Sequence, residues 1–355
     1  MRIAIVALEG SMLSAVAGLS DLFWMTGQAL RSPPEGPSQG ITVPPDFALE
    51  TQVVSPDGKP VLDPTGKLIH VDAAFQAADT YDAVIIAGMA LGDDGLPPLT
   101  ESVRQTSKWL EQCHNSGAWI AGACAGTFVL GEAGLLNGRR CTTTWWLHHA
   151  FKRRFPKANV AWGAAVEEED RIVTTGGPLS WIDIALHMIR RLAGKEIAKL
   201  AAAIAVADTQ PLPQAVYAPR GFVNTSDPIT LRAEQIVRHT KPDITAEELA
   251  AALNLSERTL HRRLKDLLSE SPKSFITRVR IETACMLLDI PGASVKQVAS
   301  QCGYADEASF RRAFARQMGM SPINYKRWQE KRRTESEESP QNIHADQADS
   351  LKTPA

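Results

Sequence analysis

Two helix-turn-helix patterns in the last third of the sequence constrain the fold more than any other feature. In the first pattern, Thr245 and Glu248 have capping-box spacing at the start of a short helix. Asn254 suits a tight turn, and Ser256 caps a second helix over residues 257–268. This order of elements predicts a helix-turn-helix unit.

The same plan repeats later in the chain. Residues 295–302 predict a short helix, Gly303 supplies the turn, and Asp306 caps a helix that ends at Met318. A separate helix over 272–288 lies between the two units. A chain with two such units can address two successive major-groove faces, about one helical turn of DNA apart.

The second helix of each unit has an outward face rich in basic and polar side chains, which can reach base edges and phosphates from the major groove. The predicted DNA contacts are Arg258, His261, Arg262 and Lys265 in the first unit and Glu307, Ser309, Arg311, Arg312 and Arg316 in the second. The residues from Asn224 to Arg333 include 19 Lys and Arg against 13 Asp and Glu, although the whole chain has a net charge of -2. A basic block beside acidic neighbours indicates a partner such as double-stranded DNA.

The first two thirds of the chain alternate between strand and helix patterns. Apolar runs over 2–8 and 83–87 predict buried strands of a parallel sheet, and a third strand opens at Trp119. Helical patterns over 15–29 and 99–116 separate these strands. We therefore expect an α/β, flavodoxin-like layered domain with a mainly parallel sheet, followed by an all-α tandem helix-turn-helix domain.

Other segments set the expected boundaries. A Pro/Gly-rich loop over 32–45 precedes a strand-turn-strand pattern over 47–61, a helix covers 180–193, and residues 208–228 are rich in proline. The tail beyond Lys331 has almost no apolar residues and is predicted to be disordered. The expected organisation is a sensing and dimerisation domain over 1–205, a linker over 206–228, a DNA-binding domain over 229–330 and a disordered tail over 331–355.

Cysteine usage and hydropathy exclude several classes of protein. The five cysteines are odd in number and lack C-x-x-C spacing, which argues against a disulfide framework or a zinc site. The start of the chain does not have the pattern of a secretory signal. The apolar stretch over 119–131 is too short for a bilayer span of about 20 residues. We expect a cytoplasmic protein that uses no metal, cofactor or membrane.

Residues 119–126 place Cys124 in the G-x-nucleophile-x-G spacing, between an apolar strand and a helix. Small residues on both sides allow the strained turn that exposes a nucleophile. A helix N-terminus behind the thiol can lower its pKa and supply oxyanion-stabilising amides. The pattern therefore indicates an enzyme-like elbow.

The last third of the chain resembles the AraC/XylS family. The resemblance rests on SERTLHR over 256–262, VASQCGY over 298–304, SFRRAF over 309–314 and GMSP over 319–322. It implies base contacts from the exposed side of each recognition helix. It also implies structural roles in the second unit for Tyr304, Phe310, Phe314, Pro322 and Tyr325.

The first part of the chain resembles the ThiJ/PfpI class, which is related to class I glutamine amidotransferases. The motifs are SPDG over 55–58, IIAG over 85–88, the elbow GACAG over 122–126, EAGLLNG over 132–138 and TTGG over 174–177. With the helical module attached, the whole arrangement is similar to the GlxA-type transcription regulators. That resemblance implies a dimer that contacts a small-molecule effector and RNA polymerase.

Enzymes of that class use a histidine as the general base for the cysteine, and this sequence lacks a histidine at the positions where they carry it. Ala125 follows the cysteine where protease-like members carry histidine, and Thr144 stands where relatives commonly have histidine before a tryptophan. The nearest histidines, 148 and 149, lie one turn further on, and Glu9 and Asp21 are the candidate carboxylates. Without a base, a general-base mechanism lacks its proton acceptor. We therefore do not expect an enzyme.

Four interpretations of the elbow remain open. It can line a ligand pocket, act as a thiol redox sensor, pack inertly in a dimerisation domain, or serve a cysteine hydrolase or glyoxalase. We favour the ligand pocket, at the carboxyl ends of the parallel strands. The candidate pocket residues are Gly88, Cys124, Ala125, Thr144, Trp145 and Gly177.

Overall fold

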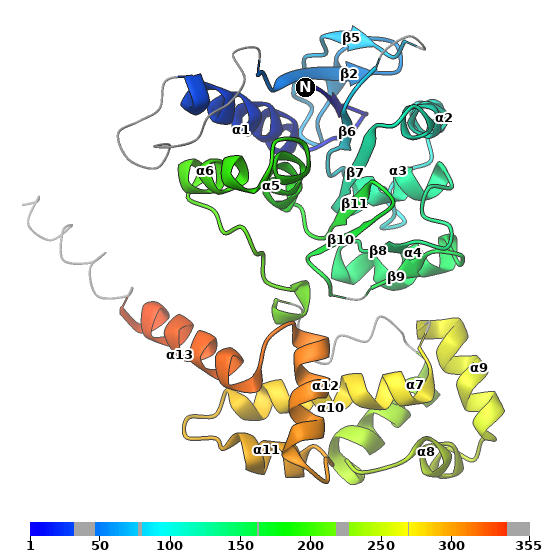
Figure 1. The fold of residues 1–355 in the computed structure, drawn as a ribbon. Coiled ribbons are helices and arrows are strands. Elements are labelled where there is room, and N and C mark those ends of the chain that lie inside the picture. Colours follow the sequence, from blue (N-terminus) through cyan, green and yellow to red (C-terminus); the bar gives the residue numbers. More distant parts are fainter. Residues whose placement is uncertain (32–46, 77–79, 162, 218–226, 269, 339–355) are drawn as a thin grey trace, which may run out of the picture. The chain divides into compact units, whose positions relative to one another are not determined.

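The computed structural model describes residues 1–31, 47–76, 80–161, 163–217, 227–268 and 270–338. The chain forms two compact units, Met1–Ala218 and Pro219–Ala355 (Figure 1). The predicted loop over 32–45 lies outside the described residues.

The described part of the first unit is built on a seven-stranded sheet in the order β10-β11-β7-β6-β1-β2-β5. Only β10 is antiparallel to its neighbour, β11, among these pairings. The strands are β1 Arg2–Val6, β2 Glu50–Ser55, β5 Ala73–Ala74, β6 Ala83–Ile86, β7 Trp119–Ala123, β10 Val166–Glu169 and β11 Ile172–Thr175. Two small sheets pair β3 Val61–Leu62 with β4 Leu68–Ile69, and β8 Arg140–Cys141 with β9 Asn159–Val160. The predicted mainly parallel sheet is confirmed.

Helices cover both faces of this sheet (Figure 1). Ala4 and Val6 of β1 pack in a core with α2, α3 and α4, whereas Ile3 and Ile5 pack on the other face with α1, α5 and α6. The strands are apolar on both faces because both are buried, as in other parallel sheets. The helices are α1 Leu13–Arg31, α2 Glu101–Asn115, α3 Thr127–Glu132, α4 His148–Arg154, α5 Trp181–Leu192 and α6 Lys195–Ala205.

The end of the first unit differs from the prediction. The sequence places a linker from residue 206, yet the chain continues to pack on the first unit through η3 Gln214–Val216. Gln214 and Val216 are only 7% and 8% exposed. These two residues are buried by segments far away in the sequence. The proline-rich stretch around them therefore contains no local pattern that predicts their burial.

The described part of the second unit is helical throughout, as expected. Its helices are α7 Pro228–Gln235, η4 Ile236–Thr240, α8 Ala246–Ala252, α9 Glu257–Leu268, α10 Pro272–Leu288, α11 Val295–Gln301, α12 Glu307–Met318 and α13 Pro322–Glu338. Helix α13 extends to Glu338, so residues 331–338 are helical where the sequence predicts a disordered tail. The rest of that tail lies outside the described residues.

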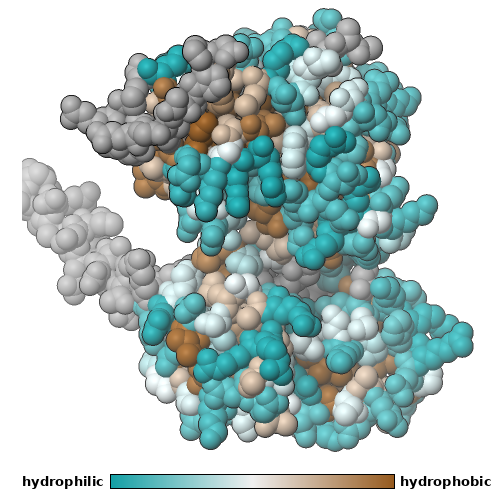
Figure 2. Space-filling view, in the orientation of Figure 1, coloured by the Kyte–Doolittle hydropathy of each residue, from teal (hydrophilic) through white to brown (hydrophobic). Residues whose placement is uncertain are grey.

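The two helix-turn-helix units share α10 as a packing platform. Leu249 of α8 and Leu264 of α9 lie in one core with Phe275 and Val279 of α10. On the face seen in Figure 2, hydrophilic residues cover most of the surface of both units. Each helix within the described part of the chain is too short or too polar to cross a membrane.

Candidate nucleic-acid interface and ligand cleft

The first helix-turn-helix has the capping geometry that the sequence predicts. The Thr245 hydroxyl accepts from the Glu248 amide at 3.2 Å, and the Glu248 carboxylate accepts from the Thr245 amide at 2.8 Å. Asn254 makes the turn with a φ of 57°, in the left-handed region that asparagine tolerates. The Ser256 hydroxyl then accepts from the Thr259 amide at 3.2 Å and starts α9. The angle between the two helices is thus fixed by local side chains.

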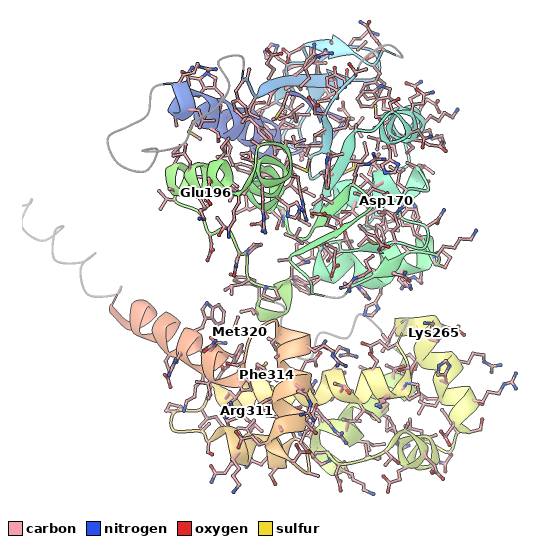
Figure 3. All side chains as sticks on the ribbon, viewed as in Figure 1. Asp170, Glu196, Lys265, Arg311, Phe314 and Met320 are labelled. Atoms are coloured by element: carbon pink, nitrogen blue, oxygen red, sulfur yellow. The ribbon has the colours of Figure 1, made fainter. Side chains whose placement is uncertain are left out.

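Helix α9 presents a basic face. Leu260 and Leu264 are 1% and 0% exposed and hold the opposite face in the core. The predicted contacts Arg258, His261, Arg262 and Lys265 all lie on the exposed face. Figure 3 labels Lys265 on this helix.

The second turn depends on a glycine for two reasons. Gly303 has a φ of +76°, and a Cβ there would lie 2.3 Å from the carbonyl oxygen of Pro242. Asp306 then caps α12, its carboxylate accepting from the Ser309 amide at 2.7 Å. The turn of the second helix-turn-helix therefore packs directly on the loop that precedes α8 of the first.

The predicted contacts on α12 divide into two groups. Arg312 and Arg316 are exposed, whereas Glu307, Ser309 and Arg311 are half-buried. Arg311 donates to Glu307 at 2.7 Å, and Arg312 donates to Ser309 at 2.9 Å (Figure 3 labels Arg311). These pairs orient both arginines along the helix before any ligand is present.

Aromatic side chains hold α12 in place. The rings of Phe310 and Phe314 lie 5.6 Å apart, and Phe314 meets Tyr325 of α13 edge-on at 5.5 Å. Tyr304 contacts Phe310 at 5.3 Å. The packing roles implied by the family resemblance are present in the structure.

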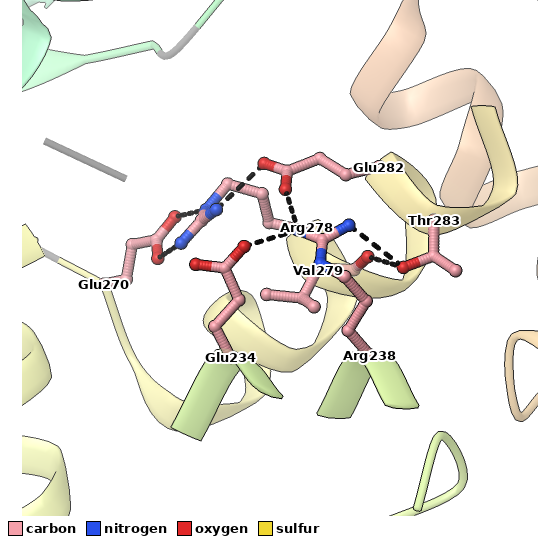
Figure 4. Close-up of polar contacts among 7 residues, drawn as sticks. All are labelled: Glu234, Arg238, Glu270, Arg278, Val279, Glu282 and Thr283. Carbon is pink, nitrogen blue, oxygen red and sulfur yellow. Dashed lines mark hydrogen bonds and ion pairs between the residues drawn. The ribbon is translucent and has the colours of Figure 1, made fainter. Parts of the chain in front are cut away.

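A buried ion-pair network lies within the second unit, and the sequence reasoning missed it. Arg278 of α10 binds Glu270 and Glu282, and Arg238 of η4 binds Glu234 and Glu282 (Figure 4). The side chains of Arg278 and Arg238 are 6% and 9% exposed. The Glu234–Arg238 and Arg278–Glu282 pairs have i,i+4 spacing, but the link between Arg238 and Glu282, 44 residues apart, depends on packing that the sequence does not show.

Asp227 connects the start of this unit to the first recognition helix. Its carboxylate caps α7 by accepting from the Thr230 amide at 2.8 Å and also binds the guanidinium of Arg263 on α9. Hydrogen bonds from Arg263 are the main cause that lowers the pKa of Asp227 to about 2. Arg263 is therefore held by Asp227 on the side of α9 away from the four predicted contacts.

The elbow at Cys124 has the expected strained backbone, but its thiol does not have the expected low pKa. Cys124 has a φ of 52° and follows β7 directly. Its side chain is buried, and this burial raises the pKa of the thiol to about 11, against smaller lowering effects of the backbone at Ala125 and Gly177 and of the Thr144 hydroxyl. The prediction of a lowered thiol pKa is wrong, because desolvation outweighs the nearby donors.

Within the described residues, the groups that act on the Cys124 thiol do not include a histidine or a carboxylate. The polar groups that act on the thiol are the backbone at Ala125 and Gly177 and the hydroxyl of Thr144, and that hydroxyl makes no hydrogen bond within the described residues. His148 and His149 are buried on α4, with their rings edge-to-face at 5.1 Å. The Glu9 carboxylate instead accepts from the Leu62 amide at 3.2 Å. The backbone of the elbow thus has the strained turn of a nucleophile site, and the described histidines and Glu9 have other neighbours.

A cleft of about 620 Å³ opens beside the elbow. It is lined by Trp145, Trp146, Ala165, Gly176, Gly177, Pro178, Leu179, Ser180, Asp183, Asp208, Gln210, Pro211, Leu212, Gln214 and Tyr217. Of the predicted pocket residues, Trp145 and Gly177 line the cleft. Gly88, Cys124, Ala125 and Thr144 are buried and do not line it.

Asp183, in the first turn of α5, is one of two acidic residues that line this cleft, the other being Asp208. Burial raises the pKa of the Asp183 carboxyl group to about 6, against a lowering effect of the Ser180 hydroxyl. A second cavity of about 170 Å³, lined partly by His187 and Lys195, shares Asp183 with the cleft. Sequence reasoning missed Asp183, since an acidic residue in a first helical turn is ordinarily explained by the helix dipole.

Two family models match the chain, one in each unit. Residues 46–191 match the DJ-1/PfpI family, and residues 249–327 match a helix-turn-helix domain. The second range begins within α8 and contains the rest of the first helix-turn-helix unit and all of the second. The combination agrees with the two resemblances noted in the sequence.

Two regulators are similar to this chain over most of its length, and an enzyme is similar to a shorter part of it. The HTH-type transcriptional regulator CdhR of Pseudomonas aeruginosa is 28% identical over 273 residues, which is 76% of this chain and 79% of that protein. The regulator GbdR of the same species is 26% identical over 280 residues, 76% of this chain and 72% of that protein. An isonitrile hydratase of Pseudomonas putida is 29% identical over 171 residues, 46% of this chain and 68% of that protein.

Proposed function

Because this chain belongs to the HTH-type transcriptional regulators that join a DJ-1/PfpI domain to an AraC-type helix-turn-helix domain, we propose that a small molecule in its first unit controls how its second unit binds DNA. The protein is a DNA-binding transcription regulator. The observation that most supports DNA binding is the pair of capped recognition helices, α9 and α12. Each helix packs in a core on one face and has basic side chains on the other.

The proposed DNA contacts are those predicted from the sequence. In the first recognition helix they are Arg258, His261, Arg262 and Lys265, and in the second Glu307, Ser309, Arg311, Arg312 and Arg316. The exposure of Arg262 and Arg312 supports bidentate contacts to guanine. The Arg311–Glu307 pair supports a different role for these two residues, in which Arg311 reaches phosphate only after exchanging its partner.

The proposed effector site is the cleft beside the elbow. Its rings of Trp145, Trp146 and Tyr217 favour an apolar body, and Asp183 favours a hydrogen-bond donor on the same molecule. The cleft volume of about 620 Å³ suits a small organic molecule.

We propose that the first unit does not catalyse a reaction, although its family includes a hydratase. The thiol of Cys124 has a pKa raised to about 11, so at neutral pH it is protonated and a weak nucleophile. Thr144 cannot act as a general base in place of histidine.

The proposal also includes the oligomeric state of the regulator, its location in the cell and its contact with RNA polymerase. The regulator forms a homodimer, as most soluble oligomers do, and the two-fold arrangement places two DNA-binding units on one operator. It acts in the cytoplasm, where its DNA is, and contacts RNA polymerase at its promoters.

Two experiments test the proposal separately. Fluorescence anisotropy with the gene's own promoter region should show binding at least 1,000-fold tighter than to scrambled DNA, a ratio typical of specific regulators. Equal binding to both would remove the sequence-specific assignment. A thermal-shift screen of small metabolites on the full chain should find a stabilising compound whose effect Trp145→Ala reduces. Stabilisation unchanged by Trp145→Ala would place the effector site elsewhere.

A further inference from the structure

Gln214 inserts its side chain into the first unit from the segment that leads to the DNA-binding unit. Its carboxamide oxygen accepts from the Trp145 amide at 2.9 Å. Its nitrogen donates to the carbonyl oxygens of Ala164 at 2.7 Å and Thr143 at 3.0 Å. These three partners are backbone groups, and the Thr142 hydroxyl also accepts from the same nitrogen at 3.4 Å, so Gln214 completes the hydrogen bonding of a region far away in sequence.

Gln214 packs directly against the backbone of Gly176, where only a glycine leaves room for it. A Cβ at residue 176 would lie 1.7 Å from the Gln214 amide nitrogen and 2.0 Å from its Cδ. The backbone of Gly176 does not have a positive φ, whereas that of Gly177 does, at +86°. The conformation at residue 176 therefore does not demand glycine, but the approach of Gln214 does.

The same segment forms one wall of the cleft. Pro211, Leu212 and Tyr217 line the cleft on either side of Gln214, and Trp145 both lines it and donates its amide to Gln214. A molecule in the cleft would contact the first unit and this segment at once. Because the cleft has this wall only while Gln214 is inserted, an occupant favours the inserted state.

The next described anchor along the chain is Asp227, which caps α7 and binds Arg263 of α9. From Tyr217, the last residue of the packed segment, to Asp227 the chain has 10 residues, which span at most about 35 Å. If Gln214 were released, the free chain would start near Val206, after α6, and about 21 residues would span up to about 73 Å. Insertion of Gln214 thus shortens the tether between the two units.

We propose that the segment Pro211–Tyr217 is a latch, with Gln214 as its anchor, whose insertion shortens the tether of the DNA-binding unit and strengthens operator binding. The inference rests on the proposed function, namely a dimer that binds two DNA sites. In a dimer, the effective concentration of the second DNA-binding unit falls roughly as the −3/2 power of tether length, so release of the latch weakens operator binding about twofold or more.

The test uses two full-length variants that release the latch by different means. Gln214→Ala removes the hydrogen bonds, and Gly176→Ala leaves the glutamine but fills its space. Their matched controls are Gln105→Ala, an exposed glutamine on α2, and Gly92→Ala, where a Cβ has ordinary contacts of 3.5 Å. Hydrogen exchange of peptides covering 210–217 reports the latch, and anisotropy with the promoter region reports DNA binding.

We expect both latch variants to raise exchange over 210–217 at least tenfold and to weaken operator binding at least twofold, with both controls like the wild type. Unchanged exchange in Gln214→Ala would show that Gln214 does not anchor the segment. Faster exchange with operator binding equal to that of the controls would show an anchor that does not reach the DNA-binding unit. If the wild-type chain bound no promoter DNA, the proposed function would fail, whereas exchange would still report whether Gln214 anchors the segment.

Discussion

Both carboxylate oxygens of Glu270 accept hydrogen bonds from the guanidinium of Arg278, at 2.8 and 3.1 Å. The same guanidinium donates to Glu282 at 2.8 Å. Glu270 follows the end of α9, so this pair fixes the first recognition helix to α10. The position of one DNA-reading helix therefore depends on a buried arginine that is not expected to touch DNA.

Replacing Arg278 with methionine should strongly destabilise the second unit. Glu270 would stay in a buried site without its partner and Glu282 would keep only Arg238, at a cost of about 3–5 kcal/mol. Urea unfolding followed by circular dichroism measures this loss. Arg232→Met, at an exposed arginine on α7, is the control and should change stability by less than about 0.5 kcal/mol. A loss below about 1 kcal/mol for Arg278→Met would mean that the network is not coupled to folding.

Truncation of the recognition helices should reduce specific DNA binding without unfolding the protein. Arg262→Ala and Arg312→Ala should each weaken operator binding by about 1–3 kcal/mol, because each removes a base or phosphate contact. Anisotropy at fixed salt concentration provides the measurement, with Arg232→Ala as the control. Wild-type affinity in both variants would contradict the assignment of these helices to DNA.

The thiol of Cys124 should react slowly. With a pKa of about 11, the thiolate makes up about one part in ten thousand at pH 7, and this fraction rises tenfold per pH unit toward pH 10. Alkylation by iodoacetamide, quantified by mass spectrometry of the Cys124 peptide in the native protein, should follow this pH dependence. Rapid modification at pH 7 would favour a redox sensor or an enzyme. Cys124→Ala should leave operator affinity unchanged.

Asp183 should make the first unit less stable as the pH rises. Its folded pKa of about 6 lies above the ordinary value of 3.8, so the folded state binds the proton more tightly than the unfolded state. Stability is then greatest below about pH 4 for this group and falls as pH rises through about 6, by about 2–3 kcal/mol.

Asp183→Asn removes that titration and should raise the melting temperature at pH 7.5 while leaving it unchanged near pH 4. Differential scanning fluorimetry over this range measures the difference, with Asp93→Asn at an exposed loop as the control. Equal melting temperatures of wild type and Asp183→Asn at pH 7.5 would mean that the carboxyl group is well solvated.

Features encoded by short-range patterns could be predicted from the sequence. The capping box at Thr245, the turn at Asn254 and the elbow at Cys124 each depend on residues within a few positions of one another. The structure reproduces all three. Local hydrogen bonding and backbone sterics are sufficient to specify them.

Features that depend on distant partners could not be predicted. The sequence around Gln214 does not predict that its carboxamide binds Trp145 and Ala164. The role of Gly176 could not be predicted either, because the positive φ of the adjacent Gly177 is already a sufficient reason for a glycine in this turn. The raised pKa of Cys124 likewise depends on burial, which the elbow motif does not encode. Long-range packing decided each of these properties.

The contact between Gly303 and Pro242 has a consequence for the operator. Arg280 of α10 donates to the carbonyl oxygens of Pro242 and Ile244, at 2.5 and 3.0 Å, so the loop on which Gly303 packs is itself fixed. We therefore expect the spacing between the two recognition helices to be fixed. One base pair inserted between the two contacted grooves shifts them by about 3.4 Å and rotates them by about 35°. Natural promoters of this regulator should accordingly tolerate base changes between the contacted grooves far better than they tolerate changes in length.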